Sequence, residues 1–149
     1  MTDNGQLILN YLQTNWTASN VDDTTPAFVR MVSSEYKYFD FNENNNVIIS
    51  HVPIDSQKPA GFGTSQKETY SSVNIDVRFS DGNLSEEAHF EKLVNEVKRI
   101  IETNLTNPPT GWQEWNFDNA NIQDLSDKRK GLWRKILPVK LMNYNVIRG

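Results

Sequence analysis

The stretch from Tyr70 to Leu105 constrains this chain more than any other, because its hydrophobic period changes once along its length. Apolar side chains first occupy every second position: Val73, Ile75, Val77 and Phe79. Such alternation predicts a strand with one buried face. Apolar side chains then recur at helical spacing: Phe90, Leu93, Val94, Val97, Ile100, Ile101 and Leu105. The stretch therefore predicts a half-buried strand followed by an amphipathic helix.

The rest of the chain supplies one more helix and several short strands. Asp3 or Asn4 can cap a helix over about residues 5–16. Strands are predicted near residues 28–32, 35–41, 47–52, 112–117 and 132–147. Pro138 in the last of these predicts an edge position or a bulge. We expect one domain over residues 1–149 with an α+β fold, in which an antiparallel or mixed sheet packs against two helices in the order α-β-β-β-α-β-β.

Composition agrees with a single globular domain of 149 residues, 37% of them hydrophobic. The absence of cysteine excludes disulfides and thiolate metal sites. The N-terminus lacks the pattern of a signal peptide, and no apolar run approaches the roughly 18 residues of a membrane span. We therefore expect an intracellular protein without a membrane partner.

Charge is divided unevenly along the chain. Residues 1–127 carry 8 basic and 19 acidic side chains, a net −11, whereas residues 128–149 carry 7 basic side chains and no acid. A basic end on an acidic body indicates self-complementary assembly or contact with an anionic partner, and the alternative is a solvated basic edge strand. Three residues of this segment are candidates for a subunit or partner interface: Arg129, Lys130 and Arg134.

Asp55 to Thr69 forms the longest stretch without periodicity, rich in glycine and polar residues. Adjacent antiparallel strands need far fewer connecting residues, so we expect a functional loop, with a plain hairpin tip as the alternative. Phe62 lies between two glycines and is a candidate aromatic anchor that becomes ordered against a partner. The interface candidates here are Lys58, Gly61, Phe62, Gly63 and Lys67.

Motifs for catalysis are scarce, and we predict no catalytic residue, metal ligand or cofactor. His51 and His89 do not have the spacing of metal ligands, and residues 61–67 depart from a phosphate-binding loop. An acidic residue at 22 or 23 followed by Glu35 and Lys37 matches a metal-dependent nuclease pattern only loosely. Trp133 beside Arg134 and Lys135 could stack on nucleic acid, but a packing role is favoured at strand spacing.

The strand "YSSVNIDVRFSD", the helix "HFEKLVNEVKRIIETNL" and the late strand "LWRKILPVKLMNYNV" together resemble tail terminator proteins of long-tailed phages and related prophage-like particles. The first helix, "GQLILNYLQTNW", also fits, so the similarity follows the order of elements over most of the chain. Head-completion and other neck or connector proteins have overlapping patterns. These proteins remain the alternative family, and a nucleic-acid-binding protein or nuclease is a further alternative.

The resemblance implies a structural virion protein and not an enzyme. Such a subunit is made in the host cytoplasm and forms a homo-oligomeric ring, usually a hexamer, at the head-proximal end of the tail tube. The implied partners are the tail tube protein and the head connector or stopper, and DNA passes through the lumen without specific binding. The polar strand residues Asn74, Asp76 and Arg78 would then border a water-filled lumen or a polar subunit contact.

Overall fold

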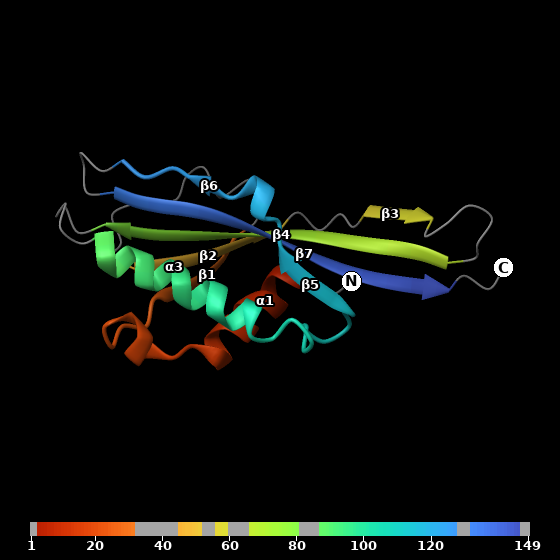
Figure 1. Ribbon diagram of the computed structural model, residues 1–149, viewed down its shortest axis with the longest axis horizontal. Helices are drawn as coiled ribbons and strands as arrows, with labels where there is room; N and C mark the ends of the chain where they lie inside the picture. Colours follow the sequence, from red (N-terminus) through yellow and green to blue (C-terminus); the bar gives the residue numbers. More distant parts are fainter. Residues whose placement is uncertain are drawn as a thin grey trace.

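The computed structural model describes residues 3–31, 45–51, 56–59, 66–80, 87–127 and 132–146. Within these residues, the helices α1 (Asn4–Asn15) and α3 (Glu87–Glu102) lie on one face of a mixed sheet (Figure 1). The strands are β1 (Ala27–Met31), β2 (Asn45–His51), β3 (Ser56–Pro59), β4 (Gln66–Ser80), β5 (Glu114–Phe117), β6 (Gln123–Asp124) and β7 (Leu132–Val146). Two 3-10 helices, η1 (Ala18–Val21) and η3 (Asn119–Asn121), lie in connections. The predicted α+β class is confirmed.

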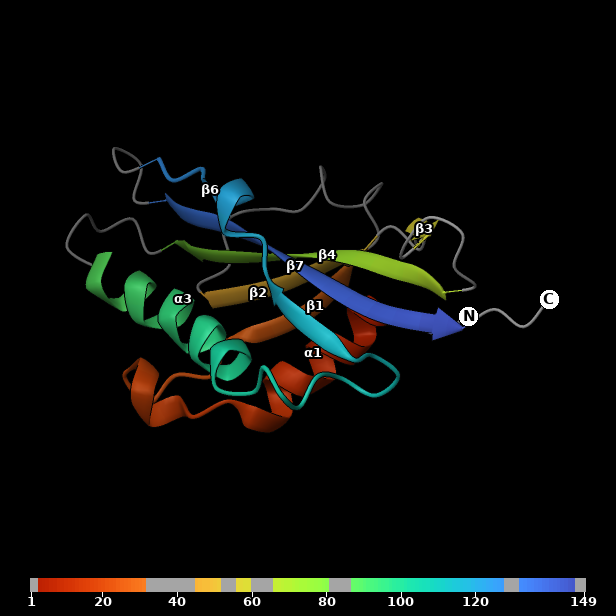
Figure 2. The same cartoon turned by 45° about the vertical axis from the view of Figure 1, so that its right-hand side comes forward.

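The sheet is organised around one long antiparallel pair. Its strand order is β1-β2-β4-β7-β5, with β3 added to β4 and β6 added to β7 (Figure 2). β4 and β7 pair from Gln66 opposite Val146 to Ser80 opposite Leu132. Only β1 and β2 run parallel among the described strands, so the sheet is mixed.

Helix α1 begins where the sequence predicted a cap. The carboxylate of Asp3 accepts a hydrogen bond from the backbone N–H of Gln6 at 3.1 Å, which satisfies one of the free donors of the first turn. Trp16 has extended backbone angles and ends the helix. Ile8 and Leu12 are fully buried, so their face of the helix packs on the sheet.

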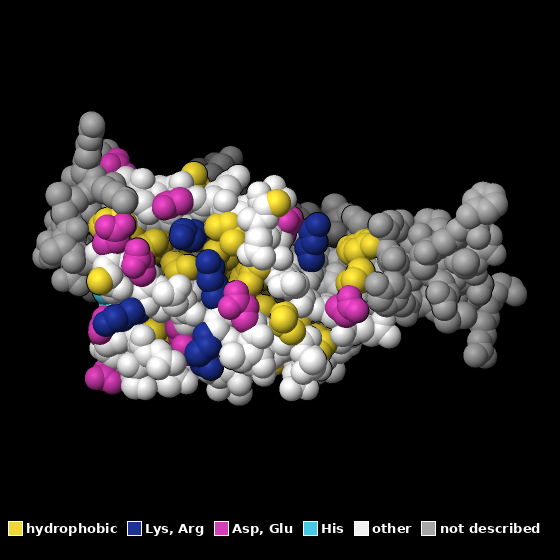
Figure 3. Space-filling model, in the orientation of Figure 1, with side chains coloured by type: hydrophobic (Ala, Val, Ile, Leu, Met, Phe, Trp, Pro, Cys, Tyr) yellow, Lys and Arg dark blue, Asp and Glu magenta, His cyan; other side chains and the backbone are white. Residues whose placement is uncertain are grey.

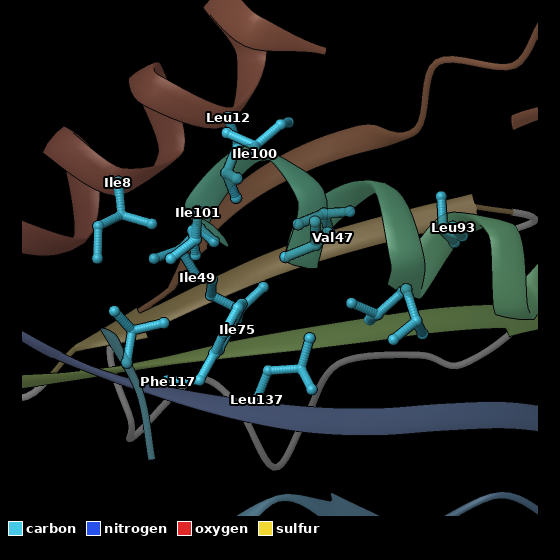
Figure 4. Packing of buried hydrophobic residues seen from close by; sticks show 14 of the residues in the cluster. Ile8, Leu12, Val47, Ile49, Ile75, Leu93, Ile100, Ile101, Phe117 and Leu137 are labelled. Carbon is cyan, nitrogen blue, oxygen red and sulfur yellow. The ribbon is translucent and has the colours of Figure 1, made fainter. Parts of the chain in front are cut away.

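Helix α3 supplies the other half of the core. Its predicted apolar positions from Phe90 to Ile101 are buried against the sheet, where Figure 4 shows Leu93, Ile100 and Ile101 near side chains of β2, β4 and β7. Each large apolar side chain buried in this way contributes about 1.5–3 kcal/mol. Leu105 was predicted to lie on the same face, but α3 ends at Glu102 and Leu105 is 41% exposed. The helical spacing of apolar residues in the sequence therefore extends beyond the last residue of the helix.

The predicted alternation of β4 is confirmed, but the expected surroundings of its far face are not. Val73, Ile75, Val77 and Phe79 are buried under the helices. Asn74 on the opposite face is exposed, as expected. Asp76 and Arg78 share that opposite face but are buried within the chain, so the prediction that they border water or a neighbouring subunit is wrong. Their burial is tolerated because the carboxylate of Asp76 forms ion pairs with both Arg78 and Arg134.

Pro138 lies in an inner strand and not at an edge. β7 is flanked by β4 on one side and by β5 and β6 on the other. The carbonyl of Pro138 accepts a hydrogen bond from the N–H of Asp118, just after the end of β5. The backbone nitrogen of Pro138 faces the same side of β7, where β5 has ended and β6 has not yet begun, so the N–H that proline lacks has no strand to pair with. The sheet tolerates this proline because its outer neighbour is interrupted there.

The stretch from Asp55 to Thr69 is more regular than predicted. Residues 56–59 form β3, and β4 already begins at Gln66. The expectation of one long irregular segment is therefore wrong for these positions. The predicted strand at 35–41 lies outside the described residues.

Candidate functional site

The β4–β7 pair continues beyond the helices. Helices cover the half formed by residues 73–80 and 132–139, whereas residues 66–72 and 140–146 extend past that layer (Figure 1). β3 pairs with the outer edge of β4 here, from Ser56 opposite Tyr70 to Pro59 opposite Lys67. We call residues 56–59, 66–72 and 140–146 the arm, and the remaining described residues the body.

A buried polar contact marks the place where the arm leaves the body. Ser71 is buried, and its hydroxyl oxygen accepts a hydrogen bond from the Asn4 side chain at 3.0 Å. The carboxamide oxygen of Asn4 in turn accepts the indole N–H of Trp112 at 2.9 Å. Small hydroxyl side chains at Thr69 and Ser71 replace the large apolar ones of residues 73–79 on the same face. On β4 the large buried apolar side chains therefore end at Val73, whereas on β7 they continue to Leu141, which lies opposite Ser71.

The edge of the arm formed by β7 has few backbone hydrogen-bond partners. β5 pairs with β7 only as far as Met142, whose carbonyl also accepts the N–H of Gln113. Beyond it, no described strand lies on that side of residues 144–146. The N–H and C=O groups of Tyr144 and Val146 point there, because backbone groups alternate in direction along an antiparallel strand. Such an edge is a template for a strand of another chain.

A pocket lies at the base of the arm. Its volume is about 440 Å³, and its lining residues come from β4, β5, β7 and the segment after α3: Tyr70, Leu105, Glu114, Trp115, Asn116, Phe117, Lys140 and Met142. Tyr70 and Glu114 each lie opposite Met142 in the strand register, on its two sides. Figure 3 shows exposed hydrophobic side chains between charged ones on this side of the molecule. Apolar surface of this kind is suited to an anchoring side chain.

The two charged side chains that line the pocket, Lys140 and Glu114, differ in their ion pairing. Lys140 lies 3.7 Å from the carboxylate of Asp118, so its charge is partly balanced. Glu114 is exposed and makes no ion pair with any described residue. The pocket rim therefore presents a carboxylate to the surroundings.

Arg134, one of the predicted interface residues, belongs to an ion-pair cluster of the body. Asp76 is fully buried and receives Arg78 at 2.9 Å and Arg134 at 3.0 Å. Arg134 is 58 residues from Asp76 along the chain but is brought close by the antiparallel register. Replacing Arg134 would disturb the fold itself, so its interface role stays a prediction that needs a different test.

A second buried carboxylate holds the segment after α1 against α3. Glu96 accepts hydrogen bonds from the backbone N–H of Thr17, the amide of Asn20 and the guanidinium of Arg99. Burial alone would raise the pKa of Glu96, but these hydrogen bonds outweigh it and hold the pKa below its ordinary value. The same contact raises the pKa of Arg99.

Asp22, considered above as a nuclease ligand, is engaged differently. Its carboxylate oxygens lie 2.6 Å from Lys92 and 3.0 Å from His89, and these hydrogen bonds lower the pKa of Asp22. Glu35 and Lys37, the other parts of that hypothesis, lie outside the described residues. Within the described ranges, no cluster of three or more histidine or acidic side chains could hold a metal ion.

The predicted interface residues divide into three groups. Lys58 and Lys67 lie on the paired strands β3 and β4 of the arm. Arg134 lies in the body. Five candidates lie outside the described residues: Gly61, Phe62, Gly63, Arg129 and Lys130. Sequence reasoning missed the pocket, because its lining comes from separate parts of the chain: Tyr70 and Leu105, for example, are 35 positions apart.

Trp133 is a packing residue, as favoured above. It is 2% exposed, and its ring stacks with Phe90 at a centroid distance of 6.1 Å. A nucleic-acid base cannot stack on a ring in that position without unfolding the core.

No family model matches the chain, and no curated protein sequence matches it significantly. In the part of the chain that the structure describes, no helix is both long and apolar enough to cross a membrane.

Proposed function

We propose that this protein is a structural virion component, a tail terminator subunit that forms a ring at the head-proximal end of the tail tube. The ring ends tube polymerisation and joins the tail to the head connector or stopper, with DNA passing through its lumen. The residue patterns of the strand, helix and late strand support the proposal by resemblance, and the order of those elements in the fold agrees with it.

The arm is the observation that carries the proposal. Paired strands that extend beyond a helix-covered core are only marginally stable by themselves, so they favour contact with another chain. In a ring subunit, the same strands provide an edge and a surface for the next subunit. The body supplies a rigid platform through its buried core and ion pairs.

The direct test is the mass of the purified chain under native conditions. We expect a closed ring, a hexamer in the family that the chain resembles, visible as an annulus by electron microscopy. When the ring is added to growing tail tubes of the same particle, tube length should stop increasing. A chain that stays monomeric at all concentrations and leaves tube growth unchanged would overturn the proposal.

The same experiment separates the alternative neck role. A head-completion protein would bind the connector and leave tube polymerisation unaffected. A monomer that binds DNA would instead favour the nucleic-acid-binding alternative.

A further inference from the structure

We infer that the pocket at the base of the arm receives the Phe62 side chain of a second copy of this chain. The inference rests on the proposed function, since it gives the contact through which neighbouring ring subunits join. The receptor is described by the structure, and the occupant is the segment of residues 60–65 that connects β3 to β4.

The pocket has the chemistry for an aromatic anchor. Tyr70, Leu105 and Met142 line it with partly or largely exposed apolar side chains, and the nearly buried Trp115 and Phe117 also border it. Leu105 is 41% exposed, although it is large and hydrophobic, and it lies outside the packed face of α3. The volume of about 440 Å³ lies within the range of pockets that bind small ligands or anchoring side chains. Leu105 and its neighbours would lose their contact with water on binding.

Phe62 is placed in the chain so that it can act between subunits. Pro59 and Lys67 are paired in the register, so residues 60–65 begin at the far end of the arm from the pocket. Tyr70 lines the pocket and lies four residues along β4 from Gln66, a distance of roughly 13 Å at the rise of an extended strand. We therefore assign the contact to Phe62 of a neighbouring copy and not to the chain's own Phe62.

Charge complements the apolar contact. Glu114 at the rim makes no ion pair with any described residue. The connecting segment is flanked by Lys58 and Lys67, one on each strand of the arm. Docking of the segment would therefore bring lysines close to a carboxylate.

The arm tip and the pocket are different surfaces of one molecule, so their contact is heterologous. Repeated contacts of this kind produce a closed ring when the rotation between subunits closes. Each subunit would then donate one Phe62 and accept one.

Two variants test the two halves of the contact. Phe62→Ser removes the anchor, and Leu105→Glu places a charge in the pocket at an exposed position. Each should raise the concentration needed for assembly at least tenfold, measured by native mass or sedimentation. Leu125→Glu is the matched control, since Leu125 is 48% exposed and does not line the pocket, and it should assemble like the wild type.

Mixing the variants tests the direction of the contact. The Leu105→Glu chain retains Phe62, and the Phe62→Ser chain retains the pocket. An equimolar mixture should form heterodimers that neither variant forms alone. Normal rings from either variant alone would overturn the inference while leaving the proposed function standing.

The closing test uses the absence of cysteine from the chain. Oxidation of a Phe62→Cys/Leu105→Cys double variant should give a ladder of covalently joined chains, whose upper limit is the ring size. A Phe62→Cys/Leu125→Cys control should give no such ladder. An internal disulfide, or no disulfide in the double variant, would overturn the inference. A wild-type chain that forms no oligomer would overturn both this contact and the ring.

Discussion

The two halves of the β4–β7 pair have the same backbone pairing but opposite surroundings. In the body, Ile75 faces Leu137 in the register and both are fully buried. At the start of the arm, Ser71 faces Leu141 on the same face and both are still buried, but the β4 residue is now a small hydroxyl side chain. On the opposite face Ser72 and Lys140 are exposed. Among the described side chains, the ladder of hydrogen bonds therefore leaves the hydrophobic core within the first residues of the arm.

The contrast between the two halves indicates which part of the molecule carries stability and which part carries assembly. Hydrophobic burial is the main favourable term in folding, so the body must hold most of the free energy of unfolding. The arm has an edge, and partly buried apolar residues such as Tyr70 and Met142, that can gain contacts when another chain is present. Substitutions of the same chemical kind should consequently have very different effects in the two halves.

The largest difference should appear between Ile75→Asp and Ser72→Asp, both in β4. Ile75→Asp buries a carboxylate among apolar side chains and should cost about 5 kcal/mol or more, enough to abolish folding. Ser72→Asp changes an exposed position and should alter the free energy of unfolding by about 0.5 kcal/mol or less. Circular dichroism and urea denaturation measure both. Equal stability of the two variants would show that the register of β4 is wrong.

A second pair compares a fully buried carboxylate, Asp76, with a partly exposed one, Asp118, both of which contact β7. Asp76→Asn leaves Arg78 and Arg134 without their carboxylate and should cost about 3–5 kcal/mol. Asp118→Asn affects an exposed contact with Lys140 and should cost about 1 kcal/mol or less. Urea denaturation of both variants at neutral pH provides the comparison. A cost below 1 kcal/mol for Asp76→Asn would mean that the cluster is not structural.

The free energy of unfolding of the body should also depend on pH through Glu96. Its pKa is lowered in the folded state, so its contribution is present above the ordinary carboxyl pKa and is lost as pH falls through the folded value. Glu96→Gln should cost about 1.5–3 kcal/mol at pH 7, because charged hydrogen bonds are lost. That difference from the wild type should shrink below about pH 4.5. A difference that stays constant down to pH 3 would contradict this role.

The boundary between arm and body should be moderately sensitive. Ser71→Ala removes the acceptor of the Asn4 side chain, which also binds Trp112, and should cost about 1 kcal/mol. Thermal unfolding measures the change. An increase in stability would mean that the polar contact does not define the end of the core.

The smallest effect on stability is expected from Arg129→Glu combined with Lys130→Glu, which lie outside the described residues. The free energy of unfolding should change by about 0.5 kcal/mol or less. If the basic segment contacts a neighbouring subunit, the variant should nevertheless assemble more weakly, and added salt should weaken the wild type similarly. A ring unaffected by both changes would remove this segment from the interface.

The contrast between the halves also explains what the sequence could predict. Residues 73–79 and α3 were predicted correctly because burial on one face imposes a local apolar period. β3 and the start of β4 were missed because serine, lysine and glutamine predominate there and no face is apolar. The start of β4 depends on pairing with residues 140–146, and β3 in turn depends on pairing with β4, which no local pattern can reveal.

Burial of polar residues was missed for a related reason. Asp76 and Arg78 alternate with apolar residues as an exposed face would, and their partner Arg134 is distant in the chain. The pocket likewise depends on how Leu105 and β5 meet the base of the arm. Long-range pairing, and not periodicity, decides both features.

Hydrogen exchange of the arm tests the central claim most directly, namely that the body carries stability and the arm carries assembly. Amides of residues 73–79 should exchange slowly both in the monomer, isolated by the Phe62→Ser variant, and in the wild-type ring. Amides of residues 66–72 and 140–146 should exchange much faster than these in the monomer and become protected in the ring. Arm amides that are as protected as those of the body in the monomer, and unchanged on assembly, would contradict the account.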